Sequence, residues 1–354
     1  MKKKALVATL AGLCMVVGAT GCAGVRTGEM VHDENTVYEW RMVHEEYTND
    51  MQDVYCKEFA ELLHEKSDGR INLQIYQVGQ IGNALQGCEI LQNGGVEFAM
   101  ISPGNTGTVV PENQLFSLHF LFPQDMDKTQ KVLKESVALN EMLAEKYLEK
   151  NIMPLSFWTE GAMQWTANKP LTSPEDFEGL KFRTMQSPMI LAAYEAYGAN
   201  PTPMSYTEVY SGLQLNMIEG QENPISAIHT SKFHEVQDYL IEANSNLYIT
   251  ATCVNPDFFN SLPEDIQQII LDTAEEMIPR SFEIQEEING AALGKIQAES
   301  DIEVIQLTDE QRAAFEEKAI AGYEVYEQVV GPEGKEILDT LRAEIEAIEA
   351  IEAE

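Results

Sequence analysis

The order of apolar segments in the first hundred positions constrains the fold most strongly. Segments 37–43, 71–76 and 96–101 have the residue types and spacing typical of β-strands. Helical patterns at 49–66 and 82–91 separate them, and each pattern is followed by a glycine-containing turn. Strands that alternate with helices at this spacing predict a parallel sheet joined by right-handed crossovers.

The rest of the chain repeats this alternation. Long helices are expected at 127–150 and 262–299, and a capping box at Thr308 and Gln311 predicts a last one. We therefore expect two α/β halves, with the chain passing between them. Further strands are expected at 151–158, 162–167, 181–184, 201–204, 218–221 and twice between 239 and 254.

The N-terminus has the features of a targeting segment. Three lysines at 2–4 precede an apolar run at 5–18 and a small-residue exit at 19–21, which predicts a signal peptide over residues 1–21. Cys22 follows directly, at the position where bacterial lipoproteins are cut and acylated. An ordinary secretory signal with an incidental cysteine is the alternative. We expect residues 22–36 to form a lipidated tether that holds the protein at the outer, extracytoplasmic side of a membrane.

The charge balance excludes one class of partner. The chain has 23 Lys and Arg residues against 58 Asp and Glu residues, a formal charge of −35. Proteins bind nucleic acids by neutralising phosphates with Lys and Arg, so we expect no nucleic-acid partner.

No motif for catalysis or for a cofactor is present in the sequence. The six histidines do not form the H-E-x-x-H pattern of metalloproteases, and no nucleophile elbow or phosphate-binding glycine loop occurs. Beyond the signal, Cys56, Cys88 and Cys253 are odd in number and widely spaced, so disulfides are not the basis of the fold, although one pair could bridge. We expect no enzyme, no metal site and no cofactor.

Arg183 is the leading candidate for a binding residue. It stands at the end of the predicted strand at 181–184, before a helix that opens at Ser187 and Pro188. Open α/β sheets bind ligands at the carboxyl ends of their strands. A guanidinium is always charged and its planar fork matches a carboxylate, although most arginines only form surface ion pairs.

An asparagine and a group of aromatic residues in the same half are further candidates for the binding site. Asn223, just before Pro224, offers both donors and an acceptor, and it fits a simple helix cap equally well. Aromatic residues could wall an apolar pocket, or each could belong to the core. They are Trp158, Trp165, Tyr194, Tyr206 and Tyr210.

These segments resemble one known family. DFEGLKFR and GANPTPMSYTEVYSGLQLNMIEGQENP are similar to the middle of the DctP-type solute receptors of TRAP (tripartite ATP-independent periplasmic) transporters. KEFAELLHEKSDGRINLQIYQVGQIGN and LPEDIQQIILDTAEE resemble their first helix–strand unit and their long helix. The resemblance covers nearly the whole mature chain. It implies a two-lobed α/β fold like the class II periplasmic binding proteins, with two mixed sheets flanked by helices and a long helix spanning both lobes.

The resemblance also implies roles for single residues. Arg183 would clamp a ligand carboxylate, Asn223 would be its polar partner and Tyr206 would line the site. Met163 stands where some relatives have a second arginine, so with Trp165 beside it we expect one clamped carboxylate and a more apolar remainder of the ligand. The opposite lobe would contribute Ser102 and Asn83.

The function implied is capture of an organic acid by lobe closure. The receptor would then deliver this acid to the membrane subunits of a transporter driven by an ion gradient. The lobes are expected at 37–160 plus 249–288 and at 161–248 plus 289–354. A sensory receptor of the same fold and a lipid-anchored hydrolase are the alternatives.

Overall fold

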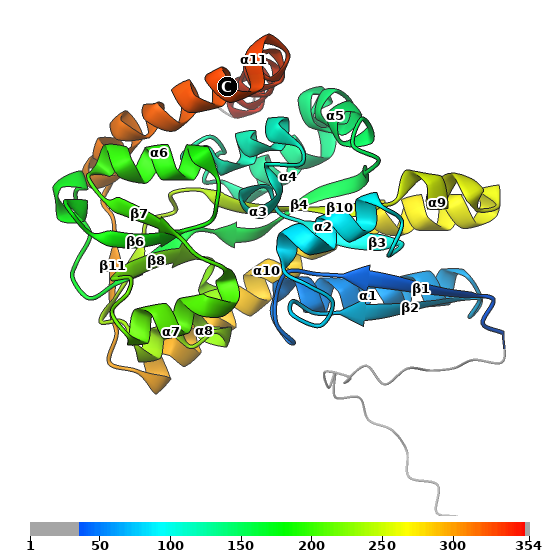
Figure 1. Ribbon diagram of the computed structural model, residues 1–354, viewed down its shortest axis with the longest axis horizontal. Coiled ribbons are helices and arrows are strands. Elements are labelled where there is room, and N and C mark those ends of the chain that lie inside the picture. Colours follow the sequence, from blue (N-terminus) through cyan, green and yellow to red (C-terminus); the bar gives the residue numbers. More distant parts are fainter. Residues whose placement is uncertain (1–34, 351–354) are drawn as a thin grey trace, which may run out of the picture. The chain divides into compact units, whose positions relative to one another are not determined.

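The computed structural model describes residues 35–350, which build two mixed β-sheets covered by helices (Figure 1). The first sheet has the order β2-β1-β3-β10-β4. In it β1 (Tyr38–Val43) lies parallel to β2 (Ile71–Tyr76) and to β3 (Phe98–Ile101). The strand β10 (Leu247–Val254) runs antiparallel to β3 and to β4 (Met153–Ala162).

The second sheet has the order β11-β9-β5-β8-β6-β7. The strand β5 (Gln164–Ala167) runs antiparallel to β8 (Gly220–Asn223) and to β9 (Tyr239–Glu242). Parallel pairs complete the sheet, with β6 (Lys181–Thr184) between β8 and β7 (Asn200–Pro203), and β11 (Glu303–Gln306) beside β9.

Helices join the two sheets. The long α10 (Glu264–Glu299) packs on α1 (Met51–Lys66) and β4 of the first sheet and on α8 (Ile225–Thr230) beside the second (Figure 1). The C-terminal α11 (Asp309–Ala350), interrupted at Gly331, crosses α6 (Pro188–Tyr197). The shorter helices are α2 (Ala84–Gln92), α3 (Pro103–Thr106), α4 (Met126–Glu135), α5 (Ala144–Leu148), α7 (Val209–Gln214) and α9 (Pro256–Ser261).

Single-turn and irregular helices fill the remaining connections. They are the 3₁₀ segments Pro111–Ser117, Pro174–Phe177, Tyr206–Glu208 and Phe233–Glu235, and the π-helical segment Ala138–Leu143. No helix within residues 35–350 is long and apolar enough to cross a membrane.

The expected two-lobed α/β fold with two mixed sheets and a long shared helix is confirmed. The exact lobe boundaries stay a prediction. The first sheet takes its strands from 38–162 and 247–254, and the second takes its strands from 164–242 and 303–306. The signal peptide and most of the tether lie outside the described residues.

The continuous helix expected at 127–150 is wrong. The chain leaves the helical conformation at Ser136, which has φ −64° and ψ 124°. The Glu344 carboxylate of α11 accepts hydrogen bonds from the Ser136 hydroxyl and from the Val137 N–H at 2.9 Å. A tertiary partner therefore satisfies the backbone group that the break exposes.

Each sheet has its own aromatic core. Trp158 stacks on Tyr55 with ring centroids 4.3 Å apart, and its indole N–H donates to Thr252 at 3.0 Å. In the second sheet Trp165 packs edge-on against Phe177 and Phe315. The thiols of Cys56, Cys88 and Cys253 are buried and free.

Candidate functional site

Arg183 is held inside the protein by the second sheet. It lies on β6 between Thr202 of β7 and Gln221 of β8, and only 2% of its surface is exposed. Its Nε and Nη2 donate to the backbone oxygen of Met204 at 3.1 and 2.9 Å. Burial lowers the pKa of Arg183 and the Glu222 carboxyl opposes this, but a guanidinium stays charged in any case. Two of its five N–H donors are thus used to orient the side chain.

Glu222 is a buried acid that interacts electrostatically with this arginine. The Tyr194 hydroxyl donates to its Oε2 at 2.6 Å. Burial raises the pKa of Glu222 to about 7, while Tyr194 and Arg183 act in the opposite direction. His119 lies 4.0 Å away, and burial lowers its pKa to about 3, so it faces Glu222 as a neutral ring.

A small cavity lies between residues of the two sheets. Its volume is about 20 Å³, room for about one water molecule. Ser102, Gly104 and Tyr248 line it from the first sheet and its following helix, and Met163, Met185 and Glu222 line it from the second. The contact is close, because a Cβ on Gly104 would come within 2.5 Å of the Met185 sulfur. Two predicted site residues, Ser102 and Met163, therefore meet at this cavity.

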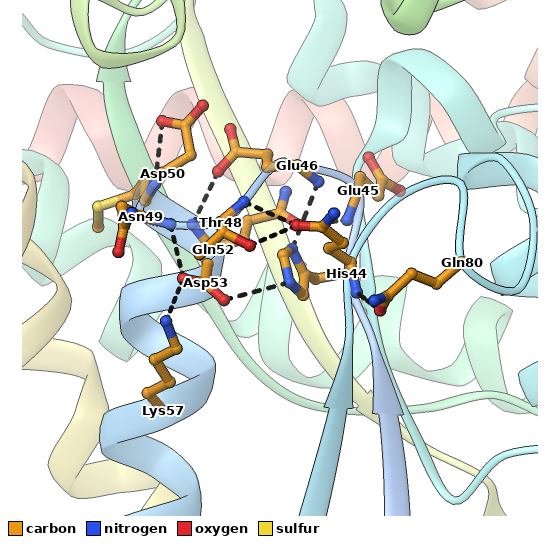
Figure 2. A network of polar contacts seen from close by, with 12 residues as sticks. His44, Glu45, Glu46, Thr48, Asn49, Asp50, Gln52, Asp53, Lys57 and Gln80 are labelled. Atoms are coloured by element: carbon orange, nitrogen blue, oxygen red, sulfur yellow. Dashed lines mark hydrogen bonds and ion pairs between the residues drawn. The ribbon is translucent and has the colours of Figure 1, made fainter. Parts of the chain in front are cut away.

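A group of buried acids faces this region, and we call it the acidic cluster: Glu45, Glu46, Asp50 and Glu160. The first three lie on the connection from β1 to α1 (Figure 2), and Glu160 lies on β4. Each is at most 5% exposed. This cluster was not predicted from the sequence, although HEEYTND directly after the first predicted strand was a signal for it.

Polar neighbours fix the cluster in place. The Ser102 hydroxyl and N–H both donate to the carboxylate of Glu45. The backbone N–H of Gln52 donates to Glu46 at 2.8 Å, and its side-chain amide donates to Glu160 at 2.8 Å. The Thr250 hydroxyl also donates to Glu160, at 2.6 Å. These carboxyl groups are therefore oriented before any ligand arrives.

Burial raises the pKa of every member of the acidic cluster. For Glu46 the contact with Glu160 adds to the effect of burial, and for Asp50 the charge of Glu46 does so. Burial likewise raises the pKa of Glu45 and Glu160, although hydrogen bonds to both work against it. Acids that are buried together cannot all ionise without a cation.

Asp53, which follows Asp50 of the acidic cluster in the sequence, forms an ion pair with a lysine. Lys57 binds it at 2.6 Å and His44 lies 3.7 Å away (Figure 2). Burial lowers the pKa of His44 to about 4, so the histidine is neutral at physiological pH. Within residues 35–350, no ion pair joins a lysine or arginine to Glu46, Asp50 or Glu160.

Two tyrosines interact with both Arg183 and the acidic cluster. Tyr206 and Tyr248 both interact electrostatically with Arg183. Tyr206 also interacts with Asp50 and Glu46, and the Tyr248 hydroxyl donates to Glu45 at 3.4 Å. The same two tyrosines thus interact with a buried cation and with buried acids.

The other predicted site residues lie elsewhere around this region. Asn223 is buried on β8 and its amide donates to Gln221 of the same strand. Trp165 is fully buried in the aromatic core of the second sheet. Asn83 caps α2 through a capping box with Gln86 and lines a separate small cavity, of about 10 Å³, beside His44 and Glu45. Ligand contacts of these three residues stay a prediction.

Comparison with known proteins places this architecture in one family. The family model described as bacterial extracellular solute-binding protein, family 7 (DctP), matches residues 42–329. The chain belongs to this family. The acidic cluster, Arg183 and Asn223 all fall inside the matched region. So do the first-sheet strands, except for residues 38–41 of β1.

Several relatives of the receptor have assigned ligands. The ectoine-binding periplasmic protein TeaA of Halomonas elongata is 38% identical over 88% of this chain and 91% of its own. The ectoine/5-hydroxyectoine-binding protein UehA of Ruegeria pomeroyi is 35% identical over 87% and 91%. A C4-dicarboxylate-binding protein DctP of Rhodobacter capsulatus is 32% identical over 78% and 82%.

The solved structures agree with the fold. A high-resolution structure of the Halomonas elongata ectoine-binding protein of the TeaABC TRAP transporter superposes with a TM-score of 0.84, covering 88% of this chain and all of that one. The relatives are periplasmic receptors of TRAP transporters. At the family level this protein is therefore a solute-binding receptor and not an enzyme.

Proposed function

We propose that this receptor captures a small zwitterionic organic acid and presents it to the membrane subunits of a TRAP transporter for ion-gradient-driven uptake. The observation that carries the proposal is that Tyr206 and Tyr248 interact both with buried Arg183 and with the buried acidic cluster. A ligand with a carboxylate at one end and a delocalised cation at the other complements both. Ectoine, the ligand named for the two relatives TeaA and UehA, has this chemistry.

In this account the carboxylate binds the free edge of the Arg183 guanidinium. Hydrogen bonds of residues 35–350 occupy Nε and one N–H of Nη2, which leaves the Nη1 and Nη2 edge for two parallel bonds. Asn223 is proposed to bond one carboxylate oxygen. Tyr206, Met163, Trp165, Ser102 and Asn83 are proposed to complete the surroundings of the ligand.

In this proposal the acidic cluster disfavours a ligand that has a second carboxylate. A dicarboxylate clamped at Arg183 would bring its other negative end toward Glu46 and Asp50, where like charges repel in a poorly solvated interior. A cationic group there is attracted by the same acids. Since micromolar binding requires about 8 kcal/mol and one charge-assisted hydrogen bond contributes about 1.5–3 kcal/mol, both ends of the ligand are needed.

Isothermal titration calorimetry with ectoine and with succinate tests this proposal. We expect one ectoine bound per receptor and no measurable heat with succinate. In Glu46→Gln the affinity for ectoine should fall at least tenfold. Glu97→Gln is the matched control, because Glu97 pairs with Arg41 at the surface, and it should bind ectoine as the unchanged receptor does. Binding of succinate but not of ectoine would overturn the proposed ligand class.

Capture is proposed to occur by closure of the lobes predicted at 37–160 plus 249–288 and at 161–248 plus 289–354. The contact of Gly104 with Met185 across the cavity belongs to the closed state in this account. Gly161, with φ +110°, lies where the chain passes from β4 to β5, a position suited to a hinge.

We also propose that the mature receptor is anchored through lipid on Cys22. The small residues before Cys22 and the lysine-rich start of the chain support cleavage and acylation there. Fractionation of cells that express Cys22→Ser tests this. The variant should move from the membrane fraction to the soluble fraction, and persistence in the membrane fraction would refute the anchor.

A further inference from the structure

Glu46 and Glu160 are neighbours in the acidic cluster, because Gln52 donates to both, through its backbone N–H and its side-chain amide, at 2.8 Å each. The two carboxyl groups also interact directly, although a carboxylate has only acceptor oxygens. Oε1 of Glu160 already accepts from Gln52 and Thr250, and no N–H or O–H of residues 35–350 donates to its Oε2. The contact therefore requires a proton between the two acids, as in other carboxyl pairs that share a site.

Among residues 35–350 no lysine or arginine forms an ion pair with Glu46 or Glu160. Glu45 and Asp50, on the connection from β1 to α1, interact electrostatically with the Glu46–Glu160 pair. Asp53 on α1 forms an ion pair with Lys57 and lies near neutral His44. From β10 the pair faces Tyr248, and from the second sheet Tyr206. From α10 the uncharged Asn289 donates to the backbone oxygen of Glu160 and accepts from the N–H of Ser226 on α8.

We propose that Glu160 is a further specificity-determining residue, which shares one proton with Glu46 in the ligand-free receptor, and that the cationic group of the ligand replaces this proton. The inference rests on the proposed zwitterionic ligand. In the exchange the cation enters, the pair becomes two carboxylates, and the proton leaves to the buffer. The charge of the cluster stays constant. A neutral group cannot make this exchange, so the pair selects for a cationic end.

The exchange links binding to pH with a defined sign. While the ligand-free pair holds its proton, each unit of rising pH should strengthen the binding of ectoine by up to tenfold. The dependence should level off where the ligand-free receptor loses the proton. Burial and the mutual contact both raise the pKa of Glu46 well above its ordinary value, which favours the protonated pair.

Calorimetry in two buffers of different ionisation enthalpy, phosphate and Tris, measures the protons released. At pH 7 we expect about one proton released per ectoine bound. In Glu160→Gln the amide can donate to Glu46 and its oxygen can still accept from Gln52 and Thr250, so binding should persist with release near zero and little pH dependence. Asp53→Asn is the matched control, because this buried acid lies outside the pair, and proton release should remain.

Each outcome separates the two proposals. Ectoine binding without proton release would overturn the shared proton and leave the receptor's ligand class standing. Unchanged release in Glu160→Gln would assign the proton to another acid and overturn the role of Glu160. Absence of ectoine binding would refute the ligand class. In that case infrared spectroscopy still tests the pair, because the ligand-free receptor at pH 7 should show a protonated carboxyl band that weakens in Glu160→Gln, and an unchanged band would overturn it.

Discussion

Replacing Arg183 by lysine separates the charge of this side chain from its shape. Lysine keeps the positive charge but has a single nitrogen in place of the planar fork. In the receptor, Nε and Nη2 donate to the backbone oxygen of Met204 at 3.1 and 2.9 Å, and no hydrogen bond within residues 35–350 uses the opposite edge. One ammonium cannot hold that oxygen and also offer two parallel hydrogen bonds to a carboxylate. We therefore expect Arg183→Lys to weaken ligand binding even though the charge is retained.

The expected magnitude follows from the number of bonds. Loss of one charge-assisted hydrogen bond costs about 1.5–3 kcal/mol, which corresponds to roughly a 10- to 150-fold increase in Kd. Calorimetric titration with ectoine measures this directly. Thermal unfolding without ligand should change little, because lysine can still donate to Met204.

Arg41→Lys is the matched control for this substitution. Arg41 also binds through Nε and Nη2, to Glu97 at 3.1 and 2.8 Å, but its side chain is 44% exposed and lies outside the site. Ectoine affinity should stay within twofold in this control. If Arg183→Lys also stays within twofold, the bidentate clamp is wrong.

Three further predictions address the hinge, closure and pH. Gly161→Ala should lower the free energy of unfolding by about 2–3 kcal/mol in urea, because φ is +110° and the new Cβ would lie 2.7 Å from the Asn289 amide nitrogen. Gly179→Ala is the control, with φ +72° and open space around the new Cβ, and it should cost about 1 kcal/mol. Equal losses in the two variants would rule out the steric contribution. Gly104→Ala should weaken ectoine binding severalfold, and adding Met185→Ala should restore much of it, whereas additive effects would refute their contact on closure. Burial raises the pKa of Glu222 to about 7, so the stability that its protonated form contributes is full below about pH 4 and is lost as pH rises through 7. Relative to Glu222→Gln, the unfolding free energy should therefore fall between pH 5 and 8, by at most about 1.4 kcal/mol per pH unit. A rise over this range would contradict the prediction.

Local patterns were enough to predict much of the fold. The alternation of strands and helices up to residue 101 is confirmed, because each segment carries its own period and its own turn. The capping box at Thr308 is confirmed by reciprocal bonds with Gln311 at 2.9 and 3.2 Å. The strand that holds Arg183 is also confirmed.

The features that the sequence did not predict depend on distant partners. The break at Ser136 relies on Glu344, 208 residues further along the chain. The acidic cluster was missed because Glu160 meets Glu46 only when β4 and β1 join the same sheet. Periodicity alone left open whether Trp165 belongs to a pocket or the core, and its packing in the second sheet needs three aromatic partners from other segments.

A crystal structure of the receptor with ectoine would show both ends of the proposed ligand at once. We expect the ectoine carboxylate on the Nη1 and Nη2 edge of Arg183, with two bonds of about 2.8 Å, and the cationic ring nitrogens against Glu46. Ectoine bound away from both groups, or bound in the reverse direction, would contradict the account.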